Sequence, residues 1–131
     1  MKRREDWAER LHDYLDARRD VPFAWGGNDC ASFAAGAVEA MTGEAPAIPQ
    51  VESAAAYLHF LRDHGPLDAI VDDTLGERLP SPAFAQRGDV VLLFVDERAT
   101  LGVCIGVEAA APGSDGMLTV PMSTATAAWR V

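Results

Sequence analysis

The chain has 131 residues and a mass of 14.0 kDa, which predicts one domain, 1–131, able to bury a core without disulfides or metal ions. Its 11 basic and 20 acidic residues give a formal net charge of −9, which argues against nucleic acid or an anionic membrane as a partner. The N-terminal region mixes acids with bases and lacks the apolar run of a secretory signal, and no later segment has membrane-spanning length. We therefore expect a protein kept in the cytoplasm unless a larger assembly carries it elsewhere.

Two helices are predicted in the first third of the chain. The three-to-four spacing of apolar residues from Trp7 to Arg18 indicates an amphipathic helix of about four turns. From Cys30 to Met41 the residues are apolar on nearly every side, which predicts a buried central helix closed by Thr42 and Gly43.

A third and a fourth helix are expected after a proline-rich link. The third lies around Val51 to His64, ends at Gly65 and has Leu58 and Leu61 on its apolar face. Apolar residues between Leu67 and Leu75 indicate a short fourth helix.

The C-terminal part of the chain has the pattern of a sheet. Apolar and β-branched runs predict strands at Val90 to Val95, Leu101 to Val107 and Met117 to Pro121, with turns at DERAT and APGSDG. A last short strand is expected near Trp129 to Val131. Helices followed by strands predict an α+β fold in which the cysteine-bearing helix packs on a C-terminal antiparallel sheet.

The segment PFAWGGNDCASF places a cysteine where a fold could use a nucleophile. Asp29 is a typical helix cap, which puts Cys30 in the first helical turn, where free amide groups and the helix dipole favour a thiolate. Gly26 and Gly27 permit a sharp turn and leave room beside the sulfur. Two alternatives stay open: Cys30 is a reactive thiol or a packed helix residue, and Asp29 caps the helix or orients a substrate amine.

The remaining candidate residues have simpler interpretations. Cys104 is expected to be a small core residue, and both cysteines to be reduced thiols. Asp89 is explained by a turn and Trp129 by the core. No cysteine or histidine spacing indicates zinc, so neither a metal nor a cofactor is predicted.

The order of these motifs resembles a known family. A loop at Trp25–Gly27, the pair Asp29–Cys30 opening a buried helix, Gly88–Asp89 before an apolar strand and a strand centred on Gly102 are similar to NlpC-type cell-wall hydrolases of the papain-like superfamily. The similarity is greatest to an uncharacterised branch associated with phages and prophages. It extends from Phe23 to Gly106 and implies a papain-like, NlpC-like fold.

The resemblance also implies a site. Cys30 corresponds to the nucleophile that attacks a peptide carbonyl in bacterial cell-wall stem peptides. The implied substrate groove comprises Phe23, Trp25, Gly26, Gly27, Asp29, Thr100 and Leu101. The family's general base is a histidine, but Thr100 or Leu101 stands in its place here, and Phe23 stands where many members have tyrosine.

The missing histidine decides between two functions. We expect His12, His59 and His64 to face solvent on helices; the alternative is that the fold brings one of them to Cys30. The favoured hypothesis is a degenerate NlpC-like module in a phage tail or prophage-derived particle, with particle proteins as partners. The alternatives are a cell-wall peptidase or amidase that uses Cys30 with an unconventional base, or a related acyl transfer. Either location, bacterial cytoplasm or assembled particle, fits the absence of a signal.

Overall fold

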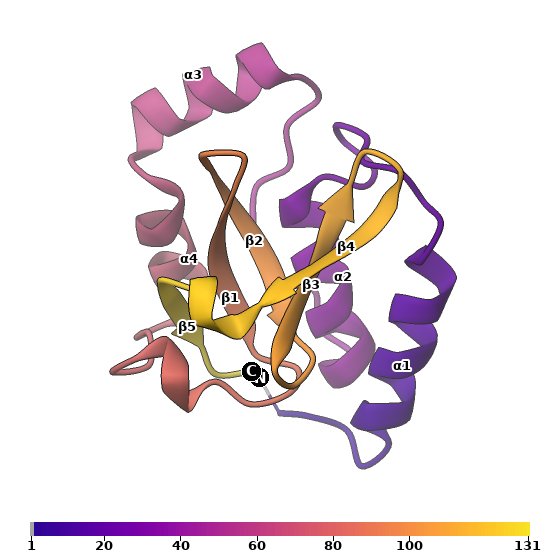
Figure 1. Cartoon of the computed structure of the whole chain (residues 1–131). Helices are drawn as coiled ribbons and strands as arrows, with labels where there is room; N and C mark the ends of the chain where they lie inside the picture. Colours follow the sequence, from indigo (N-terminus) through magenta and orange to yellow (C-terminus); the bar gives the residue numbers. More distant parts are fainter. Residues whose placement is uncertain (1) are drawn as a thin grey trace.

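The computed structural model describes residues 2–131 and has an α+β architecture, with helices first and an antiparallel sheet afterwards (Figure 1). The helices are α1 (Trp7–Arg18), α2 (Cys30–Thr42), α3 (Ala54–His64) and α4 (Leu67–Leu75), with short 3-10 turns η1 (Pro82–Phe84) and η2 (Met122–Thr124). The strands are β1 (Val90–Val95), β2 (Arg98–Cys104), β3 (Glu108–Gly113), β4 (Gly116–Pro121) and β5 (Ala127–Trp129). The predicted α+β class and all four helices are confirmed.

Helix α2 is the central helix of the fold. Asp29 caps it by accepting a hydrogen bond from the Ser32 N–H, and it ends at Gly43, which adopts the left-handed conformation with φ 83°. Most of its side chains are buried: Ser32, Phe33, Ala34, Ala35, Ala37, Val38 and Met41. The prediction of a buried helix that carries Cys30 in its first turn is therefore confirmed.

Helix α1 packs closely on α2 through one small residue. The Tyr14 hydroxyl donates a hydrogen bond of 2.9 Å to the Phe33 carbonyl. A Cβ atom at Gly36 would lie 2.8 Å from ring carbons of Tyr14, so only glycine fits there without a shift.

Helix α3 differs from its prediction at one end and on one face. It begins at Ala54 instead of near Val51, because the side chain of Ser53 accepts a hydrogen bond from Ala56 and starts the helix. Leu58, expected on the apolar face, is 63% exposed. Leu61 packs against the core as predicted, but Tyr57 and not Leu58 lies on the same inner face, so the predicted face was right at Leu61 and wrong at Leu58.

The sheet has the strand order β4-β3-β2-β1-β5 and is antiparallel at every pairing. The β1–β2 hairpin turns through only Asp96 and Glu97, whose positive φ angles of 51° and 65° match a two-residue turn of the primed type. The last three residues of DERAT belong to β2, which runs from Arg98 to Cys104. The strand predicted at Leu101 to Val107 therefore begins and ends three residues earlier than expected.

Strand β3 was missed by the sequence analysis. Its sequence, EAAAPG, has low strand propensity, and its last residues were assigned to a turn. The Ala109–Ala111 run is fully buried, so tertiary packing overrides the local preference. The turn itself is confined to Ser114 and Asp115, between β3 and β4.

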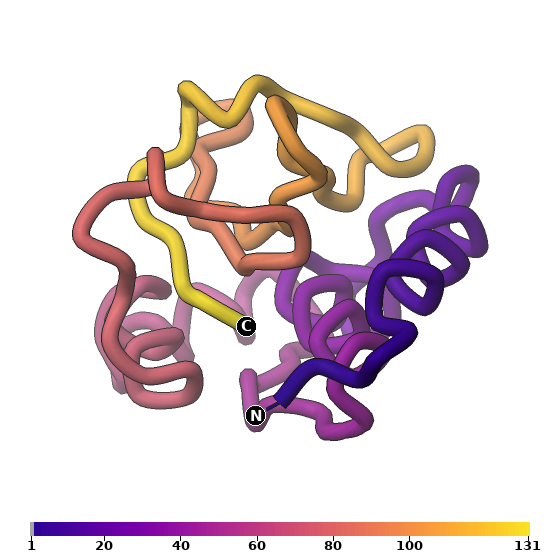
Figure 2. Tube along the Cα trace, turned by 90° about the horizontal axis from the view of Figure 1, so that it is seen from below, coloured from indigo at the N-terminus to yellow at the C-terminus, as the bar shows by residue number. Residues whose placement is uncertain are grey.

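The helices cover one face of the sheet, and the opposite face is covered by the link between α4 and β1 and by the segment that follows β4 (Figure 2). Trp129 from β5 lies in the core on the helical side, as predicted, and its indole N–H donates a 2.9 Å hydrogen bond to Asp72. On the other side, Leu79 and Met122 pack over a second cluster that contains the buried Cys104.

The two ends of the described chain lie close together where β1 begins, and the Arg3 guanidinium donates a 2.7 Å hydrogen bond to the Val131 carbonyl (Figures 1 and 2). Asp89 is fully buried there, and its carboxylate oxygens form ion pairs with the guanidinium nitrogens of Arg3 at 3.0 Å and Arg130 at 3.1 Å. It also accepts hydrogen bonds from the N–H groups of Gln86 and Val131. Asp89 therefore does form a turn, as predicted, but its larger role is to hold both ends of the chain.

Candidate functional site

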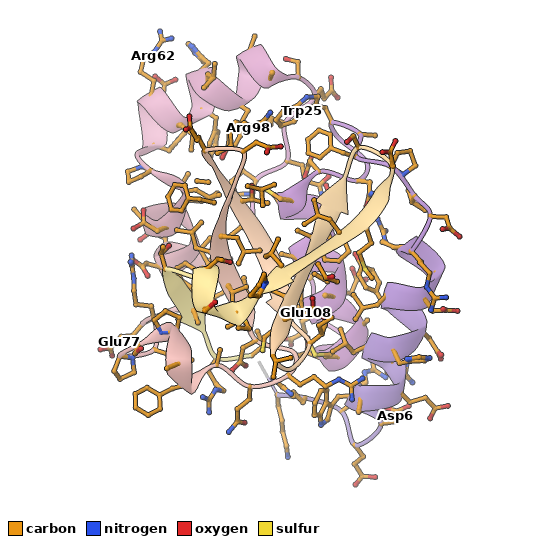
Figure 3. All side chains as sticks on the ribbon, viewed as in Figure 1. Asp6, Trp25, Arg62, Glu77, Arg98 and Glu108 are labelled. Carbon is orange, nitrogen blue, oxygen red and sulfur yellow. The ribbon has the colours of Figure 1, made fainter. Side chains whose placement is uncertain are left out.

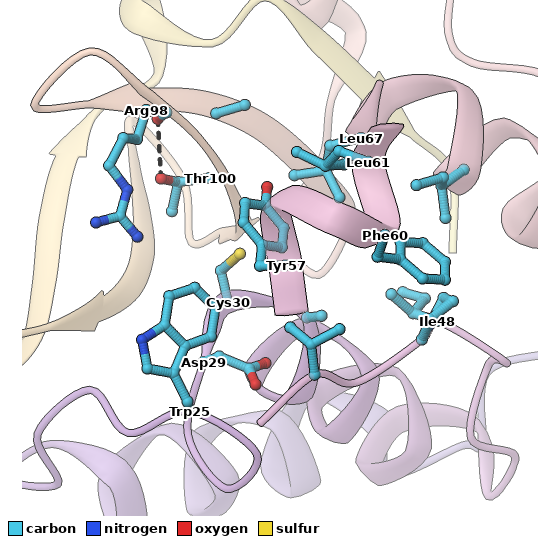
Figure 4. Close-up of a pocket in the computed structure, with 15 residues that line it drawn as sticks. Trp25, Asp29, Cys30, Ile48, Tyr57, Phe60, Leu61, Leu67, Arg98 and Thr100 are labelled. Atoms are coloured by element: carbon cyan, nitrogen blue, oxygen red, sulfur yellow. Dashed lines mark hydrogen bonds between the residues drawn. The ribbon is translucent and has the colours of Figure 1, made fainter. Parts of the chain in front are cut away.

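A pocket opens above Cys30, between the start of α2, helices α3 and α4, and strand β2 (Figure 4). Its cavity volume is small, about 40 Å³. The apolar part is lined by Ile48, Val51, Phe60, Leu61, Leu67 and Ile70. The mouth is polar and aromatic, with Trp25, Asp29, Tyr57, Arg98 and Thr100.

The loop before α2 is held in place by Asp29. Its carboxylate oxygens accept hydrogen bonds from the Ser32 N–H at 2.8 Å and the Gly26 N–H at 3.0 Å. Gly26 has a φ of 79°, a conformation that side chains rarely adopt, so glycine permits this turn. Because both oxygens accept backbone N–H groups and Asp29 is only 2% exposed, the structure favours the capping role of Asp29 over contact with a substrate amine.

The outer edge of β2 faces the pocket. The Cys104 N–H donates a hydrogen bond to the Asp89 carbonyl. In an antiparallel ladder, hydrogen-bonded pairs alternate with pairs that are not hydrogen-bonded. The N–H and C=O groups of Ala99 and Leu101 therefore point away from β1. Strand β3 pairs with β2 only at Val103 and Cys104. The backbone of Leu101, a fully buried residue, is thus free to interact with the Cys30 thiol, and it does so.

The environment of Cys30 favours the protonated thiol. Burial is the dominant effect and raises its pKa, and the nearby negative charge of Asp29 acts in the same direction. Hydrogen bonding to the backbone of Leu101 and Ala31 and the positive charge of Arg98 lower the pKa but do not overcome burial. At neutral pH the sulfur is therefore a neutral thiol, contrary to what its helix position alone suggests.

None of the three histidines lines this pocket, and all three lie within the part of the chain that the structure describes. His12 is exposed on α1. His59 is exposed on α3, and its Nε2 atom lies 3.3 Å from Oδ2 of Asp63. His64 is exposed and stacks on Phe60, with a centroid separation of 4.3 Å. The expectation that the histidines face solvent is confirmed.

The residues that stand in place of a base cannot accept a proton readily. The Thr100 hydroxyl donates a 3.0 Å hydrogen bond to the Arg98 carbonyl. Leu101 has no titratable group. Tyr57, which the sequence analysis did not identify, lies next to Cys30, but burial raises its pKa to about 12. Tyr57 is thus a hydrogen-bond donor at neutral pH.

The predicted groove residues are divided among several places. Trp25, Asp29 and Thr100 line the pocket with Cys30. Phe23 packs edge-on against Trp25, with centroids 4.9 Å apart, and lines an adjoining hollow between the two hairpins. The side chain of Leu101 lies in the core, so only its backbone reaches the site.

The two glycines of the loop contribute shape rather than contacts. Gly26 lies against Glu52, and a Cβ atom placed at Gly27 would have open space around it. Neither glycine lines the pocket.

Two important wall residues were missed, Tyr57 and Arg98. The spacing of Tyr57, Phe60 and Leu61 at i, i+3 and i+4 could have identified the inner face of α3. Arg98 was assigned to a turn. Its guanidinium lies over the Trp25 ring, 5.9 Å from the centroid, which places it at the pocket mouth (Figures 3 and 4).

Across residues 2–131 no group of three or more His, Cys, Asp or Glu side chains is arranged to hold a metal ion. Within the same residues, no helix has the length and apolar character needed to cross a membrane.

Comparison of the sequence with known proteins and protein families identifies the family to which the chain belongs. No curated protein matches the sequence. One family model, described as a domain of unknown function (DUF6950), matches residues 2–131 and so spans nearly the whole chain. The chain belongs to the DUF6950 family.

Proposed function

We propose that this protein is a non-hydrolytic member of the papain-like, NlpC-like fold, in which the pocket above Cys30 binds a ligand and does not cleave it. One observation carries the proposal: the thiol lies at the start of the buried helix, but no histidine lines its pocket within residues 2–131. Cysteine hydrolases need a base within hydrogen-bond reach to form the thiolate and protonate the leaving amine. The raised pKa of Cys30 agrees with this proposal.

The biological setting we propose is a phage tail or prophage-derived particle, with other particle proteins as partners. The motif order around Cys30 supports this setting through its similarity to phage-associated NlpC-type proteins. Mass spectrometry of purified particles from a producing strain should detect the chain at a fixed stoichiometry. Its recovery only in the particle-free fraction would contradict this setting.

A second candidate is an active cell-wall peptidase or amidase. One feature favours it: the backbone of Leu101 and Ala31 and the charge of Arg98 all stabilise negative charge near the sulfur. In this mechanism Cys30 would attack the carbonyl carbon and expel the amine, so a proton acceptor and donor would still be required.

A cleavage assay separates the two candidates. Purified sacculi and synthetic stem peptides are incubated with the protein and with Cys30→Ala, and released fragments are measured by mass spectrometry. We expect no difference between the two proteins. Fragments that form with the wild type and not with Cys30→Ala would establish the peptidase and overturn our proposal.

A further inference from the structure

The pocket mouth has an excess of hydrogen-bond donors. The two charged residues there are Asp29 and Arg98, and both oxygens of Asp29 are occupied by backbone N–H groups. The Arg98 guanidinium forms no ion pair or hydrogen bond with any described residue. Tyr57, protonated because its pKa is about 12, lines the same pocket and adds a second donor.

The position of Arg98 distinguishes it from the other arginines. Five of them, Arg3, Arg10, Arg19, Arg78 and Arg130, are bound to carboxylates, whereas Arg98 has no carboxylate partner among the described residues and lines an apolar pocket. An unpaired guanidinium in the same pocket as a hydroxyl donor is suited to a carboxylate, whose two oxygens it can bind together.

The interior of the pocket is apolar. Behind the mouth lie aliphatic and aromatic side chains from the α2–α3 link, α3 and α4, including Ile48, Phe60 and Leu67 (Figure 4). These walls contain no charged group, so a ligand that extends inward gains free energy only if its inner part is apolar.

From this charge complementarity we infer that the pocket is a binding site for a small apolar carboxylate. The carboxylate pairs with Arg98 and Tyr57 at the mouth, and a slender hydrocarbon tail extends past Cys30 between α3 and α4. This inference rests on the proposed function, because a ligand that is held needs no base. It adds the chemical class of the ligand to that proposal.

Calorimetry with octanoate tests the inference. Octanol has a similar tail without the charge, and acetate has the charge without the tail. We expect octanoate to bind at least about tenfold more tightly than octanol, because the alcohol cannot form the charge-assisted pair with Arg98. Acetate should show no measurable binding. Equal affinity for octanoate and octanol would overturn the inference.

Variants assign the binding to this pocket. Arg98→Gln should weaken octanoate about tenfold and leave octanol unchanged, whereas Arg62→Gln is the matched control because Arg62 is exposed on α3 and points outward (Figure 3). Ala31→Leu places bulk in the pocket wall and should abolish binding of both ligands. Unchanged octanoate affinity in Arg98→Gln, with circular dichroism confirming its fold, would overturn the inference.

The outcome is separable from that of the proposed function. Absence of octanoate binding together with absence of Cys30-dependent cleavage would remove only the ligand class. Cleavage of stem peptides would remove the proposed function itself. Tighter binding of an apolar peptide amide than of octanoate would show that the occupant is a polypeptide segment, which also contradicts this inference.

Discussion

Asp29 and Asp89 are both buried carboxylates at the start of a secondary structure element, but their surroundings differ. Asp29 is 2% exposed and accepts hydrogen bonds from two backbone N–H groups, without a bound cation. Asp89 is 0% exposed and binds two arginines in addition to two N–H groups. One carboxylate shapes a loop, and the other holds the two ends of the chain.

The difference separates the end of the molecule where the chain termini are held from the end where the pocket opens. The Asp89 carboxylate is paired with two arginines and two N–H groups, and these contacts join the two ends of the chain. At Asp29 the nearby cation, Arg98, is left without a carboxylate, and a pocket opens beside it. A buried polar cluster with complete pairing stabilises a fold, whereas incomplete pairing next to a cavity leaves a group available for a ligand.

The largest effect is expected at the fully paired end. Asp89→Ala leaves Arg3, Arg130 and two N–H groups without their acceptor, and should lower the free energy of unfolding by about 3 kcal/mol, measured by urea denaturation. The control is Asp6→Ala, which removes an exposed pair with Arg10 and should lower the free energy of unfolding far less than Asp89→Ala does. An equal decrease in the free energy of unfolding in the two variants would show that the contacts of Asp89 do not stabilise the two ends of the chain.

A smaller loss is expected at the pocket end. Asp29→Ala removes the cap of α2 and the bond to Gly26, and should lower the free energy of unfolding by about 1–2 kcal/mol. Ser53→Ala is the matched control, because Ser53 caps the more exposed helix α3 through a single bond. A larger loss in Ser53→Ala than in Asp29→Ala would contradict the assigned role of Asp29.

A third carboxylate, Asp72, sharpens the comparison because it has partners but lies near the surface. Hydrogen bonding from Arg78 lowers its pKa, with a smaller contribution from Trp129. A lowered pKa stabilises the folded state above the ordinary value of 3.8, and this contribution is lost as pH falls through 3.8 and below. In Asp72→Asn, the melting temperature should therefore fall less steeply as the pH is lowered below about 4 than it does in the wild type. An unchanged slope in this pH range would exclude this contribution.

The smallest effect is expected for the unpaired cation. Arg98→Gln should change the free energy of unfolding by less than about 0.5 kcal/mol, since no described carboxylate pairs with Arg98. Thermal unfolding of the variant beside Arg62→Gln measures this. A loss comparable to that of Asp29→Ala would mean that Arg98 belongs to the scaffold.

Local patterns predicted the helical half of the fold well. The helices at Trp7–Arg18 and Leu67–Leu75 were expected because their apolar spacing and end residues are local signals. The cap and the start of α2 at Cys30 were predicted for the same reason. Strand β3 was missed because Ala109–Ala111 forms a strand through its pairing with β2 and β4 and through its burial, none of which is a local signal.

The candidate site was predictable on one side only. Trp25, Asp29 and Cys30 are adjacent in sequence, and a motif identifies them. Arg98 reaches the pocket through the β1–β2 turn, which depends on contacts distant in sequence. The spacing of Tyr57, Phe60 and Leu61 marks an inner face of α3, but it does not reveal that this face lies opposite Cys30. The neutral state of Cys30 likewise arises from burial by these elements, which a helix-start pattern does not reveal.

The most direct test of the central claim is the pH dependence of Cys30 alkylation by iodoacetamide, followed by peptide mass spectrometry. Cys104, 1% exposed, should remain unmodified and serves as the internal control. With a pKa raised by burial, Cys30 should react slowly at neutral pH, with a midpoint above the value of about 8.5 of an ordinary thiol such as glutathione. A rate that has already reached its plateau below pH 7 would show a thiolate nucleophile and contradict the account.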